Sequence, residues 1–239
     1  MKPLRLRTLK TLVLVRHGES MRNKFGKGFC FPDDAARAAI GPLEDRLCPL
    51  TAEGKRQAAI AGRNLKKLIG VPTHIIHSGF VRAHQTAQGI LKAYCADELR
   101  QIEFLENNLV RERNSGYISN MTAEEVQRYF PWSTPAWRAA DRFTYIPPGG
   151  ESVVSMCEGR LLLFLQQLDL ECAGFQGATV VVVCHGRVIQ GLRYLLEGLS
   201  HDEMSELMKT ENPPNCSMTA YTFDGMHHPV MQCVNRKLW

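Results

Sequence analysis

Two arginines and two histidines follow short apolar runs of this chain: Arg16 and His17 come after TLVLV, Arg82 after THIIHS, and His185 after ATVVVVC. Arginines and histidines held together repel one another unless an anion neutralises them. The guanidinium fork of arginine matches the oxygens of a phosphoryl group, and a neutral histidine is a nucleophile toward that group. If the fold brings these four side chains together, the chemistry that they indicate is phosphoryl transfer.

These side chains meet only if the apolar runs are neighbours in one sheet. The runs at 11–15, 73–78 and 178–184 are short, rich in β-branched residues and bounded by polar residues or glycine, as buried strands are. Segments between them have helical spacing of apolar residues, notably 51–70 and 152–173. This alternation predicts an α/β three-layer sandwich with a mainly parallel central sheet and helices on both faces. Since parallel strands share one carboxyl edge, we expect the four side chains to gather there.

The rest of the chain predicts an edge hairpin and a lid. Two apolar stretches around Asp224-Gly225 predict an antiparallel hairpin at the edge of the sheet. Two segments, about 22–48 and 113–148, lack regular periodicity, and we expect these inserted segments to build a lid over the sheet. No repeat, low-complexity tract or linker divides the sequence, so residues 1–239 are expected to form a single domain.

Composition excludes several classes of protein. The chain has 239 residues, 44% of them hydrophobic and 22% charged, which is typical of a globular protein. Its net charge of +5 is not concentrated in basic blocks, so we expect a small anionic substrate rather than nucleic acid. No apolar stretch approaches the about 18 to 20 residues of a membrane span. Eight scattered cysteines without a C-x-x-C pair indicate a reduced, cytoplasmic protein. The oligomeric state stays open, a homo-oligomer included.

The sequence predicts no metal and no cofactor. His74 and His77, and the adjacent His227 and His228, lack a carboxylate or cysteine partner at ligand spacing. Phosphoryl transfer needs charge stabilisation and an in-line nucleophile more than it needs a metal. Fixed arginines and a protonated histidine can take the place of Mg²⁺.

Five motifs occur in the order found in the histidine phosphatase superfamily, which includes the cofactor-dependent phosphoglycerate mutases. They are LVRHGES with Asn23, SGFVRAHQTA, RERNSG, PPGGES and VVVCHG. The stretch PLTAEGKRQA, residues 49–58, also resembles the family's segment after the first motif. The resemblance spans about residues 11–190, and five ordered motifs are far more specific than Arg-His-Gly alone.

The resemblance implies how the reaction runs. His17 resembles the nucleophile that takes the phosphoryl group and forms a phosphohistidine. It must present an unprotonated ring nitrogen, and we expect its other nitrogen to donate to a backbone carbonyl. Glu112, after a short apolar stretch that we interpret as a further strand, resembles the general acid that protonates the leaving oxygen. Water then releases phosphate, with Glu112 acting as base.

The resemblance also implies a phosphate pocket. Its residues are Arg16, Arg82 and His185, with Asn23 and the Gly186 backbone as further donors. Ser20 lies in the same first loop and is placed near the substrate. We interpret Glu151 and Ser152 as residues of a helix start, where an acid and a hydroxyl are favourable.

The active-site residues alone do not separate hydrolases from mutases. A mutase must keep water from the phosphohistidine, which favours a long, basic cap. About 37 residues separate Glu112 from Gly150, a modest cap that carries four arginines, Arg113, Arg128, Arg138 and Arg142. We therefore favour a metal-independent phosphomonoester hydrolase. The alternatives are mutase-type phosphoryl transfer and a non-catalytic phosphate-dependent binding protein, which the complete set of catalytic residues disfavours.

The lid sequence leaves its own role open. The aromatic residues of the second segment either face the substrate or pack as a small cluster under a long loop. Lys24, Lys27, Phe29 and Phe31 make the first segment either a second wall of the pocket or a solvated loop.

Overall fold

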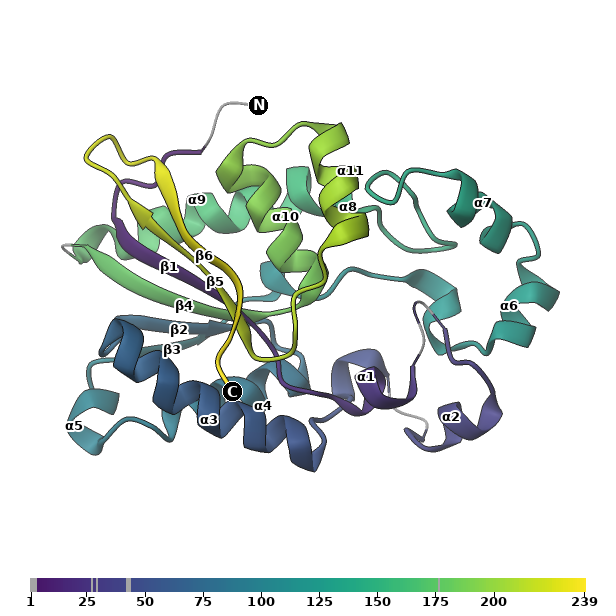
Figure 1. Ribbon diagram of the computed structural model, residues 1–239, viewed down its shortest axis with the longest axis horizontal. Coiled ribbons are helices and arrows are strands. Elements are labelled where there is room, and N and C mark those ends of the chain that lie inside the picture. The colour runs from purple at the N-terminus through teal and green to yellow at the C-terminus, as the bar shows by residue number, and fades with distance from the viewer. Residues whose placement is uncertain (1–3, 27, 29, 42–43, 176) are drawn as a thin grey trace.

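A six-stranded mixed sheet lies at the centre of the protein (Figure 1). The computed structural model describes residues 4–26, 28, 30–41, 44–175 and 177–239. The strand order is β3-β2-β4-β1-β5-β6. Four strands run parallel, namely β1 (Leu9–Arg16), β2 (His74–His77), β3 (Glu103–Glu106) and β4 (Ala178–Cys184). The predicted C-terminal hairpin is confirmed as β5 (Ser217–Phe223) and β6 (Pro229–Lys237), which add to β1 in antiparallel fashion.

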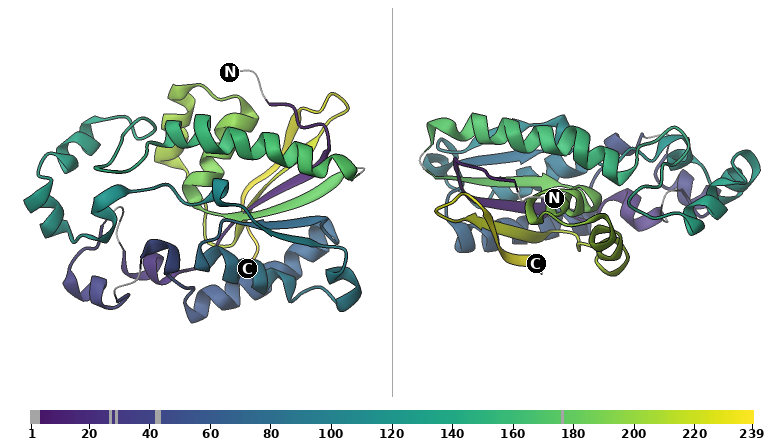
Figure 2. Two further views of the ribbon diagram at one scale, coloured as in Figure 1. Left: turned by 180° about the vertical axis from the view of Figure 1, so that it is seen from behind. Right: turned by 90° about the horizontal axis from the view of Figure 1, so that it is seen from above.

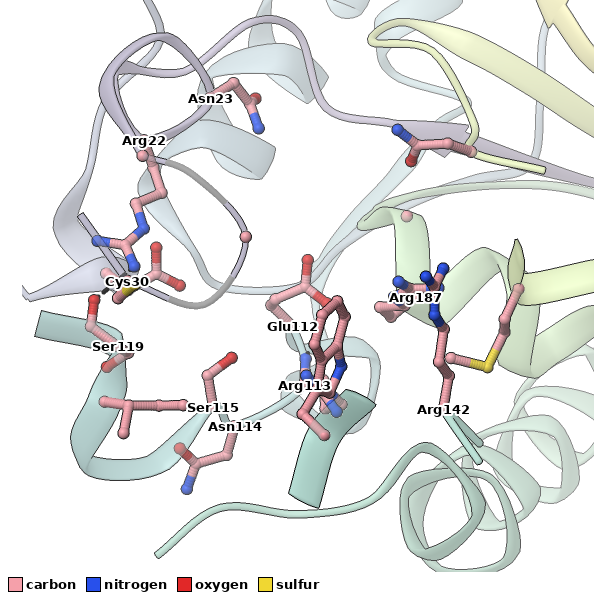
Figure 3. A pocket seen from close by; sticks show the side chains of 18 of the residues that line it. Arg22, Asn23, Cys30, Glu112, Arg113, Asn114, Ser115, Ser119, Arg142 and Arg187 are labelled. Carbon is pink, nitrogen blue, oxygen red and sulfur yellow. Dashed lines mark hydrogen bonds between the residues drawn. The ribbon is translucent and has the colours of Figure 1, made fainter. Parts of the chain in front are cut away.

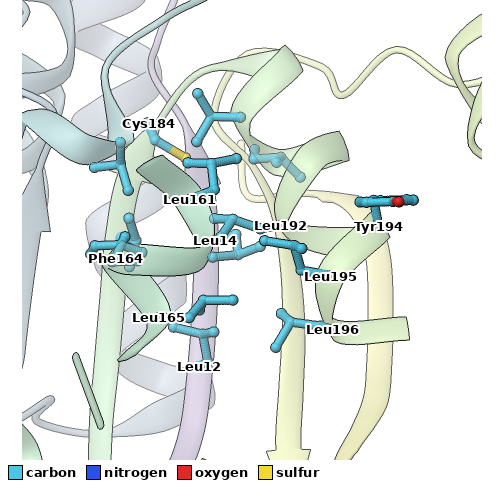
Figure 4. Close-up of a cluster of buried hydrophobic side chains, with 14 of the residues drawn as sticks. Leu12, Leu14, Leu161, Phe164, Leu165, Cys184, Leu192, Tyr194, Leu195 and Leu196 are labelled. Atoms are coloured by element: carbon cyan, nitrogen blue, oxygen red, sulfur yellow. The ribbon is translucent and has the colours of Figure 1, made fainter. Parts of the chain in front are cut away.

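Strand β1 supplies side chains to two separate hydrophobic cores. Leu12 and Leu14 belong to the core under α9 (Leu162–Glu171) and α10 (Gly186–Glu197), as Figure 4 shows. Val13 and Val15 belong to the core under α3 (Ala52–Ile69) and α4 (Val81–Leu91). Successive side chains of a strand point to opposite faces, and each such buried side chain contributes about 1.5–3 kcal/mol. The expected three-layer α/β architecture is therefore confirmed, and Figure 2 shows its helices on both faces of the sheet.

Helix α3 begins and ends where the sequence predicts. The Thr51 side chain caps it by accepting a hydrogen bond from the Gly54 amide at 3.0 Å. It ends at Gly70, whose φ of 71° lies in the region that glycine adopts without strain.

The predicted helix after Ser152 is broken by a π turn. Ser152 caps α8 (Val153–Met156), as expected for a helix start. A π-helical turn, Cys157–Leu161, follows before α9, and a 3-10 turn, Cys172–Gly174, ends the segment. Arg160 lies within this π turn and is buried.

The two inserted segments contain short helices that the sequence analysis did not predict. The first holds α1 (Met21–Phe25), α2 (Asp34–Ala38) and the 3-10 turn η1 (Asp45–Leu47). The second holds η3 (Gly116–Asn120), α6 (Ala123–Tyr129) and α7 (Ser133–Ala139). Figure 1 places them together beyond the carboxyl ends of the parallel strands. Helices of this length bury few apolar residues, so they leave little periodicity to detect.

Contacts between the two segments make them one lid. The Phe31 amide donates to the Met121 carbonyl at 2.8 Å, and the Ala123 amide donates back to the Phe31 carbonyl at 2.8 Å. Arg37 pairs with Glu125 at 2.6 Å across the same junction. Lys27 and Phe29, considered above as part of a pocket wall, lie outside the described residues.

Two further helices also escaped prediction. They are α5 (Ala96–Leu99), after α4, and α11 (His201–Thr210), which packs against α10. Within the described ranges, no helix combines the length and hydrophobicity needed to cross a membrane.

Candidate active site

Neighbouring strand ends bring the two histidines together. Strands β1 and β4 pair in parallel with Arg16 opposite Cys184, and the His17 amide donates to the Cys184 carbonyl at 3.0 Å. The rings of His17 and His185 lie 5.1 Å apart between centroids, nearly edge to face. Ser78, which directly follows β2, places its hydroxyl 2.8 Å from His185 Nε2. The expected gathering of residues at the carboxyl edge of the sheet is thus the arrangement observed.

A close backbone approach explains the glycine after His17. A Cβ on Gly18 would lie 2.5 Å from the Gly54 carbonyl oxygen, and a Cβ on Gly54 would lie 2.0 Å from the Glu19 carbonyl oxygen. Neither position has room for a side chain, because the atoms in contact belong to the backbone. The loop after β1 therefore packs directly on the first turn of α3, which fixes the position of His17.

Hydrogen bonding fixes the tautomer of His17. Its side chain is buried, and Nδ1 lies 2.7 Å from the Gly18 carbonyl oxygen. Burial, and then the charges of Arg82 and Arg16, hold the pKa of His17 well below the usual value, although the bond to Gly18 opposes this shift. A carbonyl only accepts, so Nδ1 carries the proton of the neutral ring and Nε2 keeps its lone pair. His17 therefore presents an unprotonated ring nitrogen, Nε2, in the free protein.

His185 and Glu112 face each other across the site. His185 Nδ1 is buried and has no hydrogen-bond partner among the residues that the structure describes, and it lies 3.8 Å from Glu112 Oε2. Burial, followed by the charges of Arg82, His17 and Arg16, holds the pKa of His185 well below the usual value. Glu112 keeps its other oxygen on the amide of Arg113 at 2.9 Å. One carboxylate oxygen thus faces Nδ1 of His185.

The loop that carries Glu112 does not continue directly from a strand. Strand β3 ends at Glu106, and a 3-10 turn, η2 (Asn108–Val110), separates it from Glu112. A further strand does precede Glu112, as interpreted from the sequence, but it ends six residues earlier. Leu109 and Val110 pack beneath the loop as part of the main core, which accounts for their apolar character.

Arg160 and Glu151 hold this loop in place. Arg160 Nη1 donates to the Leu109 carbonyl at 2.5 Å, and Nη2 lies 3.3 Å from the Glu112 carbonyl. Arg160 also pairs with Glu151 at 2.9 Å, and Glu151 Oε1 accepts from the Asn114 amide at 2.9 Å. Glu151 thus does more than begin a helix, because the Arg160–Glu151 pair clamps both ends of the Glu112 loop.

The two expected phosphate-pocket arginines have different partners. Arg16 Nη1 donates to the Pro213 carbonyl at 2.5 Å, while its Nε is buried and has no hydrogen-bond partner in the described part of the chain. Gly186, at the first turn of α10, lies beside this group, since a Cβ there would be in van der Waals contact with Arg16 Nε at 3.7 Å. Arg82 instead pairs with Asp45 of the lid, with Nη2 3.0 Å from Oδ2.

Ser20 and Asn23 have structural partners in the loop after β1. Ser20 is fully buried and caps α1, and its hydroxyl also donates to Asn23 Oδ1 at 3.1 Å. Asn215 Nδ2 donates to both Asn23 Oδ1 and the His17 carbonyl, at 3.1 and 2.9 Å. Both Ser20 and Asn23 line the cavity described below, with these contacts holding them there.

A cavity of about 1180 Å³ lies between the strand ends and the lid, and seven of the eight residues predicted for the site line it. The exception is His185, which is fully buried behind the lining. Its lining carries further basic residues, among them Arg22, Arg113, Arg142 and Arg187, which Figure 3 shows around Glu112. The carboxylates in this lining are Asp45, Glu112 and Glu211. Burial lowers the pKa of Arg187 from its usual value, and the nearby charge of Arg142 adds to this shift. The cavity is therefore built for an anionic ligand.

Some aromatic side chains of the lid face the cavity and others do not, so both expectations hold in part. Trp137 and Tyr145 line the cavity. Phe143 instead belongs to the main core, and Tyr117, Tyr129 and Trp132 are exposed. Among the lid arginines, Arg113, Arg138 and Arg142 line the cavity, whereas Arg128 is exposed beside Tyr129.

Sequence reasoning missed Asp45, Asn215 and Arg160 as parts of the site. Asp45 lies in a segment without periodicity, and Asn215 lies in the loop before β5, so neither carries a local signal. Arg160 interrupts an otherwise apolar helical face, which is the one signal that was present. In the described part of the chain, no group of three or more His, Cys, Asp or Glu residues has a metal-binding arrangement.

Comparisons with known proteins show the family to which the chain belongs. The family model of the histidine phosphatase superfamily, branch 1, matches residues 12–236. A 2,3-bisphosphoglycerate-dependent phosphoglycerate mutase of Bartonella bacilliformis is 32% identical over 200 residues, or 82% of this chain and 85% of the relative. The same enzyme of Bartonella henselae is 30% identical over 221 residues, or 90% and 93%.

Solved structures share the fold. A mycobacterial glucosyl-3-phosphoglycerate phosphatase in complex with inorganic phosphate has a TM-score of 0.70 at 22% identity, covering 96% of this chain and 98% of its own. YhfR of Bacillus stearothermophilus has a TM-score of 0.72 at 22% identity, covering 95% and 96%. The chain belongs to the histidine phosphatase superfamily, and like the mutases and phosphatases of that family it is an enzyme.

Proposed function

We propose that the protein is a metal-independent phosphomonoester hydrolase that works through a phosphohistidine on His17. In this mechanism Nε2 of His17 attacks phosphorus, the bond to the leaving oxygen breaks, and Glu112 gives that oxygen its proton. Water then attacks the phosphohistidine, Glu112 takes a proton from it, and orthophosphate leaves with His17 restored. Arg16, Arg82 and His185 hold the phosphoryl oxygens, with the Gly186 backbone as a further donor.

The tautomer of His17 carries this proposal. Its Nδ1 is held by the Gly18 carbonyl, so the lone pair of Nε2 belongs to a nucleophile that lines the cavity. Burial, together with the two arginines beside it, lowers the pKa of His17 and keeps the ring neutral before substrate binds. Once a phosphoryl group is bound, the same arginines stabilise the charge that develops on its oxygens. One arrangement thus serves both the nucleophile and the transition state.

We also propose that the whole chain forms one domain and that the protein is reduced and cytoplasmic. One sheet unites strands from Leu9 to Lys237, which supports a single domain over residues 1–239 with segments 22–48 and 113–148 as its lid. The described cysteines are free thiols, which supports a reduced, cytoplasmic protein.

The test is hydrolysis of p-nitrophenyl phosphate in EDTA between pH 5 and 8, with His17→Asn as the key variant. Asparagine keeps a donor near the position of Nδ1 but has nothing in place of Nε2, so turnover should be lost while the fold persists. His227→Asn is the matched control, because His227 has a left-handed φ of 64° that asparagine tolerates. The native protein and His227→Asn should both carry acid-labile phosphate after reaction with substrate, whereas His17→Asn should carry none. Retained turnover in that variant would remove the phosphohistidine mechanism.

Mutase activity is the second candidate, and the extra basic residues favour it. Arg142 and Arg187 line the cavity beyond the expected phosphate pocket, where a second acidic group of a substrate would bind. Phosphorus NMR with a phosphoglycerate and catalytic bisphosphoglycerate distinguishes the two. We expect orthophosphate to appear; movement of the phosphoryl group between the two substrate oxygens without orthophosphate release would establish the mutase instead.

A further inference from the structure

Arg82 is occupied by a carboxylate from the lid. Its side chain is buried at the first turn of α4, and Nη1 donates to the Asp45 backbone carbonyl at 2.6 Å. Nη1 and Nη2 then face the two carboxylate oxygens of Asp45, at 3.2 and 3.0 Å. This two-pronged geometry is the one in which arginine also binds a phosphoryl group. Asp45 therefore takes the place of an anionic ligand on Arg82.

Asp45 belongs to a part of the lid that has its own small core. It begins the 3-10 turn η1, and 37 positions separate it from Arg82 in the sequence. The buried members of the adjoining core are Phe31, Ile40 and Cys48, none of which belongs to the two cores that flank the sheet. Asp45 thus stands on a segment whose apolar core is separate from the two cores that hold α4 and the sheet.

The charge balance changes when a phosphoryl group arrives. In the free pocket, Arg16, Arg22 and Arg82 line one cavity, and Asp45 supplies negative charge there. The charge of Asp45 also acts on Arg22, where it raises the pKa against the opposing effect of burial. A phosphoryl dianion brings more negative charge to the same arginines, so it repels Asp45 while it competes for Arg82.

We propose that Asp45 is an exchangeable counterion of the phosphate pocket. It holds Arg82 when the pocket is empty, yields Arg82 to the phosphoryl group of the substrate, and takes Arg82 back as orthophosphate leaves. This proposal rests on the proposed role of Arg82 as a phosphate ligand, and it applies to a hydrolase and a mutase alike. Because Asp45 competes with every ligand of Arg82, it raises the apparent Kd of substrate and of orthophosphate by one common factor. In return it speeds the release of product.

Calorimetric titration with orthophosphate tests this exchange without any need for turnover. Asp45→Asn keeps the shape of the side chain and removes its charge, so it should bind orthophosphate about tenfold more tightly than the native protein. Asp34→Asn is the matched control. It removes one charge from the same lid segment, but Asp34 is 82% exposed and pairs with Arg37 outside the cavity. Its affinity for orthophosphate should stay unchanged.

The opposite role for Asp45 predicts the opposite result. If Asp45 only orients Arg82, Asp45→Asn binds orthophosphate equally well or more weakly, and the exchange is overturned. A crystal structure with bound orthophosphate is a second test, and it needs no variant. Separation of Arg82 from Asp45 in that structure supports the exchange, and an intact ion pair overturns it.

Steady-state kinetics separates this proposal from the proposed function. In Asp45→Asn, the KM for substrate and the inhibition constant of orthophosphate should fall by the same factor. Tighter orthophosphate binding without turnover in either protein would support the exchange and overturn the hydrolase. Absence of orthophosphate binding in both proteins would overturn both.

Discussion

Replacement of Arg160 by methionine should disable Glu112 without touching it. Arg160 is 9% exposed, and its guanidinium donates to the carbonyls of Leu109 and Glu112 and to the Glu151 carboxylate. Methionine fills much of the same volume and offers no donor. The variant therefore frees the loop on which Glu112 stands, while the Glu112 side chain itself is unchanged.

The expected magnitudes follow from these contacts. A hydrogen bond from a charged donor contributes about 1.5–3 kcal/mol, and loss of one partner of a buried ion pair costs about 3–5 kcal/mol. Because the Glu151 side chain is 19% exposed, water compensates part of its lost partner, and we expect a net loss of about 3 kcal/mol in unfolding free energy. A displacement of Glu112 by about 1 Å should lower the rate of its proton transfer about 100-fold.

Substrates with different leaving groups isolate this effect. An alkyl phosphate needs a proton on its leaving oxygen, whereas p-nitrophenolate leaves unaided, so only the alkyl phosphate should lose about 100-fold in kcat/KM. Arg193→Met is the matched control. Arg193 is 7% exposed and pairs with Glu197 and Glu211, so its loss costs similar stability without freeing the Glu112 loop.

Two results would refute this reasoning. Equal losses on both substrates, or a loss no larger than in Arg193→Met, would mean that Arg160 contributes only stability. The double variant Arg160→Met with Glu151→Gln removes the unpaired carboxylate as well. It should recover part of the stability but keep the defect on alkyl phosphates, because the loop stays free.

Three further predictions concern the acid, the buried histidines and the glycine contact. Glu112→Gln should lose activity on alkyl phosphates far more than on p-nitrophenyl phosphate, and equal losses in kcat/KM would count against Glu112 as the acid. Because burial and nearby arginines depress the pKa values of His17 and His185, the unfolded chain binds more protons below about pH 6.5. The unfolding free energy in urea should therefore fall from pH 7 to 5.5, by up to about 1.4 kcal/mol per pH unit for each histidine, and His17→Asn should flatten this dependence. Gly18→Ala should cost about 1–3 kcal/mol in the same assay because its Cβ meets the Gly54 carbonyl, whereas Gly174→Ala, with open space around it, should cost nothing.

The sequence by itself determined the sheet and the residues at its edge. Strand β1 buries alternate side chains on two faces, and this short-range period is visible in the residues as they stand, as are the cap at Thr51 and the stop at Gly70. Because parallel strands end at one edge, the pattern also placed Arg16, His17 and His185 together.

Only the tertiary structure decided what holds those residues. Asp45 and Arg82 are 37 positions apart, and Arg160 and Glu112 are 48 apart, so no local period relates either pair. Their contacts exist because a lid segment folds back over the strand ends and because the helical segment that carries Arg160 packs against the Glu112 loop. Such pairs depend on where separate segments come to lie, and that depends on packing across the whole molecule rather than on neighbouring residues.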